Sequence, residues 1–258
     1  NLLRVYGTTG FAEYMLEVIR EDELDMKVVL GVWIAPEEHR DQAGQVTESF
    51  PEAVASNARE VAAGIRLAAA YPDIVISVCV GNETQVDWSA HRSPRDILIK
   101  HVRRVRAGVE VPVTVADDFN FWNKPESREV VAQIDYITMH AHPMWNGLQL
   151  EDALPWLRRQ VTAIGIYHPE RPIVLGETGW ATSVAEEGEQ AELIKGRPGE
   201  SEQKEFYEAV RAWAAENRQP VFFFEAFDEN WKGGTNPAEV EKHWGLYRAD
   251  RSPKAVMR

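Results

Sequence analysis

Short apolar runs alternate with longer stretches of helical periodicity along the whole chain. Seven runs rich in Val, Ile and Phe have the length and composition of buried strands, at residues 2–6, 27–33, 74–80, 111–115, 134–140, 172–176 and 219–224. Apolar residues at helical spacing fill the gaps at residues 11–21, 50–71, 95–105 and 202–217. Strands separated by helices are typical of a parallel sheet with helical crossovers, so the pattern predicts an α/β fold.

The spacing of the strands favours a barrel. From Tyr6 to Phe224, the ends of the first and last runs, the chain takes six steps, roughly 36 residues each, as in a (β/α)8 TIM barrel of about 250 residues. Because the chain opens almost directly with a strand, we expect the first of eight strands to be missing from it. An open doubly wound sheet is the alternative, but no strand is followed by a glycine-rich phosphate turn. We expect a single domain over residues 1–258.

Charge and hydropathy argue against two classes of partner. The chain has 28 Lys and Arg against 41 Asp and Glu, a formal charge of −13 at pH 7, so a nucleic-acid partner is not expected. Its apolar runs are far shorter than the ~20 residues of a membrane-spanning helix, and no signal peptide is visible at its start. The single cysteine, Cys79, excludes an internal disulfide and is expected in a buried strand. We expect a monomer without a membrane segment.

Acidic and aromatic side chains follow the predicted strands. In a barrel of parallel strands the active site gathers at the carboxyl ends, so these positions are the first to inspect. Five segments occupy them: Gly81-Asn82-Glu83-Thr84, Asp117-Asp118-Phe119-Asn120-Phe121-Trp122, His140-Ala141-His142-Pro143-Met144-Trp145, Gly176-Glu177-Thr178-Gly179-Trp180 and residues 225–232. Carboxylates next to flat rings suit a carbohydrate cleft, although the rings would equally suit ordinary core packing.

Two of these carboxyl groups can form a glycosidase pair. Glu83 and Glu177 belong to separate strand ends and could face each other across a barrel mouth. Glycoside hydrolysis needs one protonated and one ionised carboxyl, and a separation of ~5–5.5 Å lets the ionised group attack the anomeric carbon with retention of configuration. Burial and neighbouring charges decide which group keeps its proton. A retaining reaction therefore requires Glu83 and Glu177 to lie at that separation.

Three motifs in this order resemble the signatures of glycoside hydrolase family 17, the β-1,3-glucanases and related transglycosylases. They are Val80-Gly81-Asn82-Glu83, Gly176-Glu177-Thr178-Gly179-Trp180 and Phe227-Asp228-Glu229-Asn230-Trp231-Lys232. The second is quite specific, whereas an asparagine followed by a glutamate recurs in many retaining barrel glycosidases. The resemblance extends from Arg4 to Lys232 and is closer to the compact bacterial and fungal-type members than to the plant enzymes.

The resemblance implies a role for each matching residue. Glu83 is expected to be the general acid/base, Glu177 the nucleophile, and Asn82 a donor to the 2-hydroxyl of the reacting sugar. The expected substrate-binding residues around them are Tyr6 beside the nucleophile, Glu229 and Lys232 tuning the charges of the pair, His140, Trp145 and Trp122 lining the cleft, and Trp180 as a stacking platform. The substrate is expected to be a β-glucan, hydrolysed or transferred to another sugar.

Other readings of the same residues remain open. His140 and His142 share one face of a strand and could bind zinc, and Asp117 with Asp118 could bind calcium, but neither pair has a complete ligand pattern, so no metal or other cofactor is expected. The alternatives in function are a catalytically inactive glucan-binding barrel and a retaining β-glycosidase of another linkage specificity. Because polymeric glucans lie mostly outside the cytoplasm, a periplasmic or extracellular location is expected.

Overall fold

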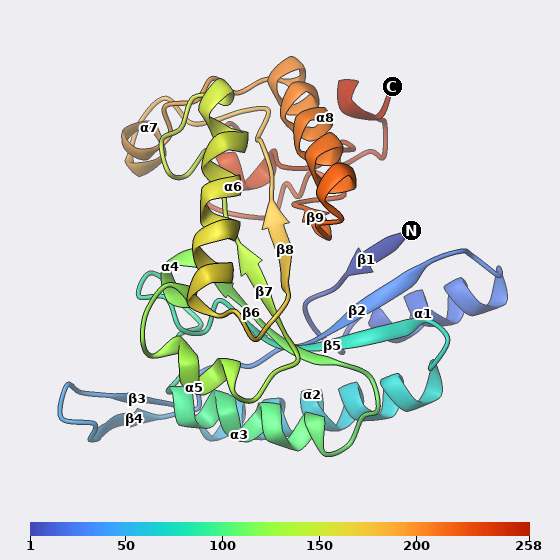
Figure 1. Cartoon of the computed structure of the whole chain (residues 1–258), viewed down its shortest axis with the longest axis vertical. Coiled ribbons are helices and arrows are strands. Elements are labelled where there is room, and N and C mark those ends of the chain that lie inside the picture. Colours follow the sequence, from blue (N-terminus) through green and yellow to red (C-terminus); the bar gives the residue numbers. More distant parts are fainter. The chain divides into compact units, whose positions relative to one another are not determined.

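The computed structural model describes residues 1–258 and contains a seven-stranded sheet with the strand order β1-β2-β5-β6-β7-β8-β9 (Figure 1). The pairs β1–β2, β2–β5, β5–β6 and β8–β9 are parallel. Each strand overlaps a predicted run, and β5, β6 and β8 continue two or three residues beyond theirs: β1 Leu2–Arg4, β2 Lys27–Val32, β5 Val75–Asn82, β6 Val113–Asp118, β7 Tyr136–His140, β8 Ile173–Thr178 and β9 Val221–Phe223. The prediction of parallel strands is confirmed.

Helices follow the strands, four of them where they were predicted. These are α1 Ala12–Glu21, α2 Pro51–Ala70, α3 Arg95–Arg106 and α8 Glu200–Asn217. Not predicted were α4 Phe119–Trp122, α5 Ser127–Val131, α6 Leu150–Tyr167, α7 Glu189–Leu193, the 3₁₀ helices η1 Val240–Lys242 and η2 Ala255–Met257, and the antiparallel hairpin of β3 Glu38–Arg40 and β4 Val46–Ser49. None of the helices is both long and apolar enough to cross a membrane.

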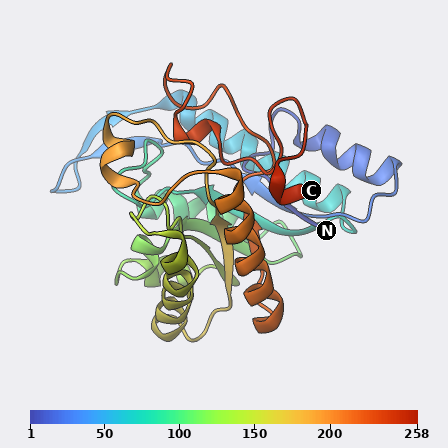
Figure 2. The same cartoon turned by 90° about the horizontal axis from the view of Figure 1, so that it is seen from above.

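The chain divides into two compact units, and the prediction of a single domain stays a prediction. The first unit is Asn1–Met139 with Ile164–Ile173, and the second is His140–Ala163 with Val174–Arg258. In the first unit, α2 and α3 pack side by side and cover β2 and β5, as Figure 1 and Figure 2 show. Strand β5 is buried along most of its length, because both of its neighbours and these helices exclude water from it.

A buried carboxylate on α2 fixes the loops that follow β1 and β2. Glu60 is 3% exposed and accepts hydrogen bonds from the backbone N–H groups of Thr8 at 2.8 Å, Thr9 at 3.1 Å and Trp33 at 3.1 Å. A carboxylate that accepts several N–H groups satisfies donors that would otherwise be buried without partners. Glu60 therefore holds two strand ends of the first unit in place.

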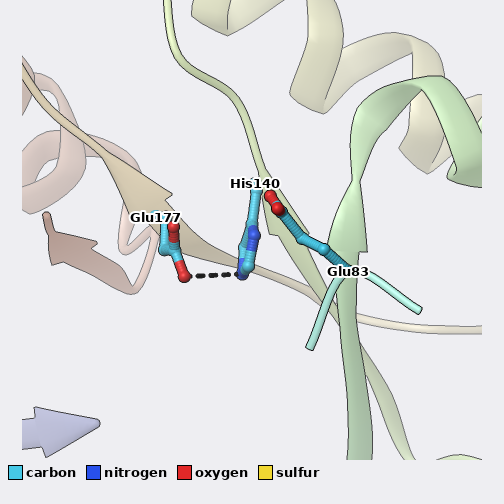
Figure 3. A group of neighbouring side chains, drawn as sticks. All are labelled: Glu83, His140 and Glu177. Carbon is cyan, nitrogen blue, oxygen red and sulfur yellow. Dashed lines mark ion pairs between the residues drawn. The ribbon is translucent and has the colours of Figure 1, made fainter. Parts of the chain in front are cut away.

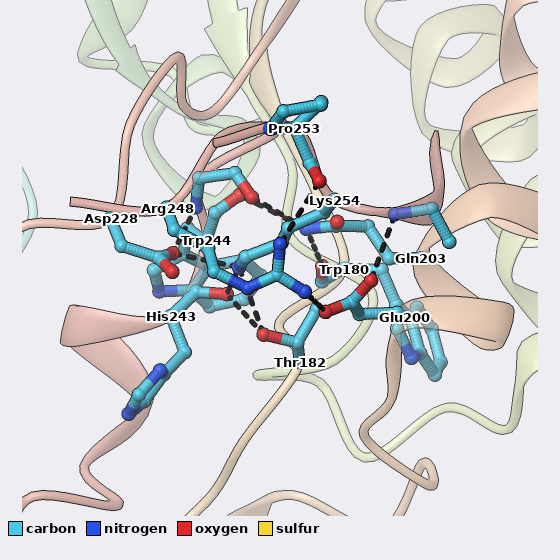
Figure 4. Close-up of polar contacts among 12 residues, drawn as sticks. Trp180, Thr182, Glu200, Gln203, Asp228, His243, Trp244, Arg248, Pro253 and Lys254 are labelled. Atoms are coloured by element: carbon cyan, nitrogen blue, oxygen red, sulfur yellow. Dashed lines mark hydrogen bonds and ion pairs between the residues drawn. The ribbon is translucent and has the colours of Figure 1, made fainter. Parts of the chain in front are cut away.

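A buried lysine performs the corresponding task in the second unit. Lys254 is 2% exposed, and its ammonium donates to Asp228 Oδ1 at 2.7 Å, Thr182 Oγ1 at 2.9 Å and the His243 carbonyl at 3.2 Å (Figure 4). Burial lowers the pKa of Lys254 although Asp228 opposes the shift. The three bonds use all three ammonium protons and connect the C-terminal segment to the loops after β8 and β9.

Replacing Lys254 with Met is expected to destabilise the protein by about 3–5 kcal/mol, because removal of one partner leaves the buried Asp228 carboxylate without its cation. Urea or thermal unfolding measures the loss. Lys204→Met is the matched control, since its contact with Glu208 is a surface pair at 3.9 Å and is expected to contribute less than about 1 kcal/mol. Equal stability of the two variants would contradict the structural role of Lys254.

Candidate active site

In the first unit, Glu83 lies on a tight turn at the carboxyl end of β5. Gly81 has φ +78° and Glu83 has φ +48°, both in the left-handed region, and Glu83 is half-buried. A Cβ at Gly81 would meet Leu98 at 3.0 Å and Thr84 at 3.1 Å, so the position needs glycine for conformation and for space. The Glu83 N–H donates to the Ala116 carbonyl of β6 at 2.9 Å, which ties the turn to the neighbouring strand.

Arg4 connects two other predicted residues of this unit. Its guanidinium donates to Asn82 Oδ1 and lies 4.7 Å from the centroid of the Tyr6 ring, which is 36% exposed. Because the Arg4 bond engages the amide oxygen, the Asn82 NH₂ group is the part oriented to donate elsewhere. The sequence reasoning did not select Arg4, since an arginine inside a strand run carries no signal of its partner 78 residues away.

Asp117 is a fully buried carboxyl group one strand away from Glu83. It is 0% exposed and accepts the backbone N–H groups of Gln85 at 2.9 Å and Asp118 at 3.0 Å. Burial, and then the charge of Glu83, raise the pKa of Asp117 well above its usual range. Asp118 accepts the Asn120 N–H at 2.9 Å and caps α4. Both carboxyl groups thus bond the backbone, a structural use that does not favour the calcium alternative.

In the second unit, Glu177 lies near the carboxyl end of β8 between two imidazole rings. The carboxylate is largely buried, with His140 Nε2 at 3.3 Å from Oε1 and His142 Nε2 at 3.4 Å from Oε2. Figure 3 shows His140 beside Glu177 and also draws Glu83 at the end of its strand. The His142 ring is held edge-on by Phe224 at 5.5 Å and Trp244 at 5.3 Å. His142 Nε2 lies within hydrogen-bond distance of one carboxylate oxygen and His140 Nε2 lies against the other, so the two rings hold the Glu177 carboxylate in orientation.

The residues after Glu177 have structural tasks. A Cβ at Gly179 would lie 2.3 Å from the Phe224 carbonyl oxygen, so only glycine lets the end of β9 approach here. Trp180 is 1% exposed, packs on Phe206 with ring centroids 5.6 Å apart, and donates its indole N–H to the Arg197 carbonyl at 2.9 Å. A covered ring has no face on which a sugar can stack, so the structure does not support the stacking role expected for Trp180.

Trp122 is likewise an anchor inside the first unit. It is 0% exposed, and its indole N–H is shared by the carbonyls of Asp117 at 2.9 Å and Thr138 at 3.2 Å. The expected cleft-lining role of Trp122 therefore does not fit this structure, because the ring is covered on all sides. Trp231, for which packing beneath the loops and contact with sugar were both open, is 76% exposed.

Lys232 lies between two carboxylates at the end of β9. Its ammonium is 2.6 Å from Glu225 Oε2, 2.7 Å from Glu229 Oε2 and 4.5 Å from the Phe224 ring centroid. Burial raises the pKa of Glu225 to about 8, and Glu229 adds to the rise, whereas Lys232 opposes it. Burial lowers the pKa of Lys232, but the two carboxylates outweigh burial and the net shift is upward. The structure brings the predicted Glu229 and Lys232 together and adds Glu225.

The raised pKa of Glu225 predicts a pH dependence of stability. Between the ordinary glutamate pKa near 4.5 and the folded value of about 8, the folded state holds a proton that the unfolded state has released. Stability from this group is therefore present below pH 4.5 and lost as the pH rises through 8. The free energy of unfolding, measured with urea, should fall between pH 5 and 8.5 in the wild type. In Glu225→Gln we expect this decrease to be smaller by roughly 1–2 kcal/mol. The exposed Glu192→Gln should leave the slope unchanged.

A second carboxyl group of this unit was missed by the sequence reasoning. Glu241, in η1, lies beside Trp145, and burial raises its pKa while the charges of His142 and Lys232 lower it. The predicted cleft residue Trp145 is thereby held on the same group of side chains as His142. No motif or strand marks Glu241 along the sequence, so only the folded chain reveals it.

The fold is a parallel sheet alternating with helices, and glutamates with aromatic and basic neighbours lie at separate strand ends. This combination defines a glycosidase of the (β/α)-barrel class. The chain belongs to the BtgE/BtgC glycoside hydrolase domain family, which matches residues 1–245. The resemblance to glycoside hydrolase family 17 drawn from the three motifs is confirmed.

Known proteins agree with this assignment. A glucan 1,3-β-glucosidase of Schizosaccharomyces pombe is 26% identical over 270 residues, which cover 98% of this chain and 75% of that protein. The solved structure of an endo-laminarinase from Formosa Hel1_33_131 matches with a TM-score of 0.82 and 26% identity, covering 100% of this chain and 76% of that one. A glycoside hydrolase family 17 β-1,3-glucanosyltransferase from Rhizomucor miehei matches in fold with a TM-score of 0.74 and 23% identity, covering 99% and 85%. The predicted TIM-barrel fold is confirmed, with seven strands in this chain.

Proposed function

We propose that the chain is a retaining enzyme acting on β-1,3-glucan, with Glu177 as nucleophile and Glu83 as general acid/base. The observation that carries the proposal is the Glu177 carboxylate, buried at a strand end and flanked by His140 and His142. The family match and the similarity to a glucan 1,3-β-glucosidase and an endo-laminarinase support the choice of substrate.

The proposed reaction has two steps. Glu177 attacks the anomeric carbon while Glu83 gives its proton to the departing glycosidic oxygen, which leaves a glycosyl ester on Glu177. Glu83 then takes a proton from the acceptor hydroxyl, whose oxygen displaces Glu177 and restores the free carboxylate. Water as acceptor gives hydrolysis, and a sugar hydroxyl gives transglycosylation. The retaining course requires the two carboxyl groups to be about 5 Å apart.

Other side chains bind and orient the sugar in this proposal. Asn82, with its amide oxygen on Arg4, donates its NH₂ group to the 2-hydroxyl, a bond that strengthens as positive charge develops on the ring. Tyr6 and Trp145 offer ring surface, since neither is fully covered. Lys232 with Glu225 and Glu229 sets the local charge. A polymeric substrate makes a periplasmic or extracellular site of action part of the proposal.

The test is to incubate the protein with a β-1,3-gluco-oligosaccharide and follow product masses over time. Shorter products alone identify a hydrolase, and products longer than the starting oligomer identify transglycosylation. Binding without turnover would instead favour a glucan-binding barrel. Turnover of only a differently linked β-glucan would overturn the linkage and keep the mechanism.

A further inference from the structure

Asp117 is a buried carboxyl group that the proposed reaction does not use. It is entirely covered, and its two oxygens accept the N–H groups of Gln85 and Asp118. A carboxyl group is costly to bury, and hydrophobic side chains would pack at this strand position without that cost. Its presence at the carboxyl end of β6 therefore calls for a function in holding a nearby segment.

That segment is the turn that carries Glu83. Residues 83 to 85 are tied to β6 at two points, by the Glu83 N–H on the Ala116 carbonyl at 2.9 Å and by the Gln85 N–H on Asp117 Oδ2 at 2.9 Å. The second of these bonds, from Gln85, depends wholly on the Asp117 side chain. The left-handed backbone at Glu83, φ +48°, costs on the order of 1 kcal/mol and persists only where the surroundings fix it.

The strand side of this arrangement is itself rigid. The Asp117 carbonyl accepts the indole N–H of the buried Trp122, so the backbone of Asp117 is itself held by a hydrogen bond. On the turn side, the Gln85 amide donates to the carbonyls of Thr84 at 2.9 Å and Ser93 at 3.1 Å, which closes the loop after Glu83 on itself. Asp117 joins these two rigid parts.

We propose that Asp117 is a positioning residue that fixes the turn of Glu83 so that its carboxyl group is placed for proton transfer. The inference rests on the proposed role of Glu83 as general acid/base. Proton transfer requires the acid within hydrogen-bond distance of the departing oxygen, so a shift of the turn by an ångström costs rate at that step only. The attack by Glu177, which comes from the second unit, does not depend on this bond.

The experiment compares kcat/KM for two substrates that share one β-1,3-glucosyl chain. In the first the leaving group is a sugar, which needs protonation, and in the second it is 2,4-dinitrophenol, which leaves without it. Asp117→Ala is expected to lower kcat/KM for the first by roughly 10- to 100-fold, up to the lower end of the contribution of general acid catalysis, and for the second by less than about threefold. Asp117→Asn keeps one acceptor for Gln85 and should fall between wild type and Ala.

Asp135→Ala is the matched control, since Asp135, just before β7, bonds the opposite end of β6. Its carboxylate accepts the Val113 N–H at 2.8 Å, so the variant also loses a side-chain bond to the backbone of β6. It should leave the ratio of the two kcat/KM values unchanged. Equal losses on both substrates in folded Asp117→Asn, or no loss on either, would overturn the inference. If the wild-type protein turns over neither substrate, the proposed function fails instead.

Discussion

Replacing Glu177 with Ala is expected to lower kcat on β-1,3-gluco-oligosaccharides by a factor on the order of 10⁴ or more, because no covalent intermediate can form without the carboxylate. The fold should persist, since the side chain removed is an acid beside two imidazoles rather than part of the apolar core. His140 and His142 would then face a small cavity at the end of β8.

Azide tests whether Glu177 is the nucleophile and not merely a binding group. A small anion can enter that cavity and attack the anomeric carbon from the side that Glu177 occupied, so the variant should form a glycosyl azide of α configuration. Product configuration is read by NMR. A β azide, or retained turnover without azide, would contradict the assignment. The exposed Glu192→Ala, in α7, serves as the control and should keep wild-type activity.

Strand positions were predictable from the sequence because a buried strand requires a continuous run of apolar residues. Strand β5 has only two side chains that are not buried, so its run of Val, Ile and Cys stands out from the polar segments on either side. The β3–β4 hairpin has no such run, since every residue of β4 is exposed. Helix α6 contains Pro155, which along the sequence indicates the end of a helix and not its interior.

The candidate site divides in the same way. Glu83 and Glu177 are recognisable because short motifs mark their strand ends. Arg4 contacts Asn82, and Glu241 contacts Trp145, although the partners lie far apart along the chain. No motif near either residue predicts these contacts. Trp180 shows the opposite error, since a tryptophan after a strand-end glutamate reads as a sugar platform, whereas the close approach allowed by Gly179 folds the segment inward.

Replacing Glu83 with Ala is expected to reveal its two roles separately, as proton donor to the leaving group and as base for the acceptor. With a sugar as leaving group, kcat/KM should fall by roughly 10³- to 10⁴-fold, because the departing oxygen receives no proton. With 2,4-dinitrophenol as leaving group, kcat/KM should fall less than about tenfold, since that phenolate leaves unaided. Hydrolysis of the intermediate then becomes slow, because water reaches it without a base, and a burst of dinitrophenol should precede the steady state.

Azide distinguishes this variant from that of Glu177. The intermediate on Glu177 still forms, so azide attacks it from the face that Glu83 served and yields a glycosyl azide of β configuration, opposite to the product of Glu177→Ala. An α azide from the Glu83 variant would exchange the roles of the two glutamates. Equal losses on both leaving groups would show that Glu83 binds substrate without transferring a proton. The β product would therefore identify Glu83 as the group that serves the acceptor, and Glu177 as the group that carries the glycosyl ester.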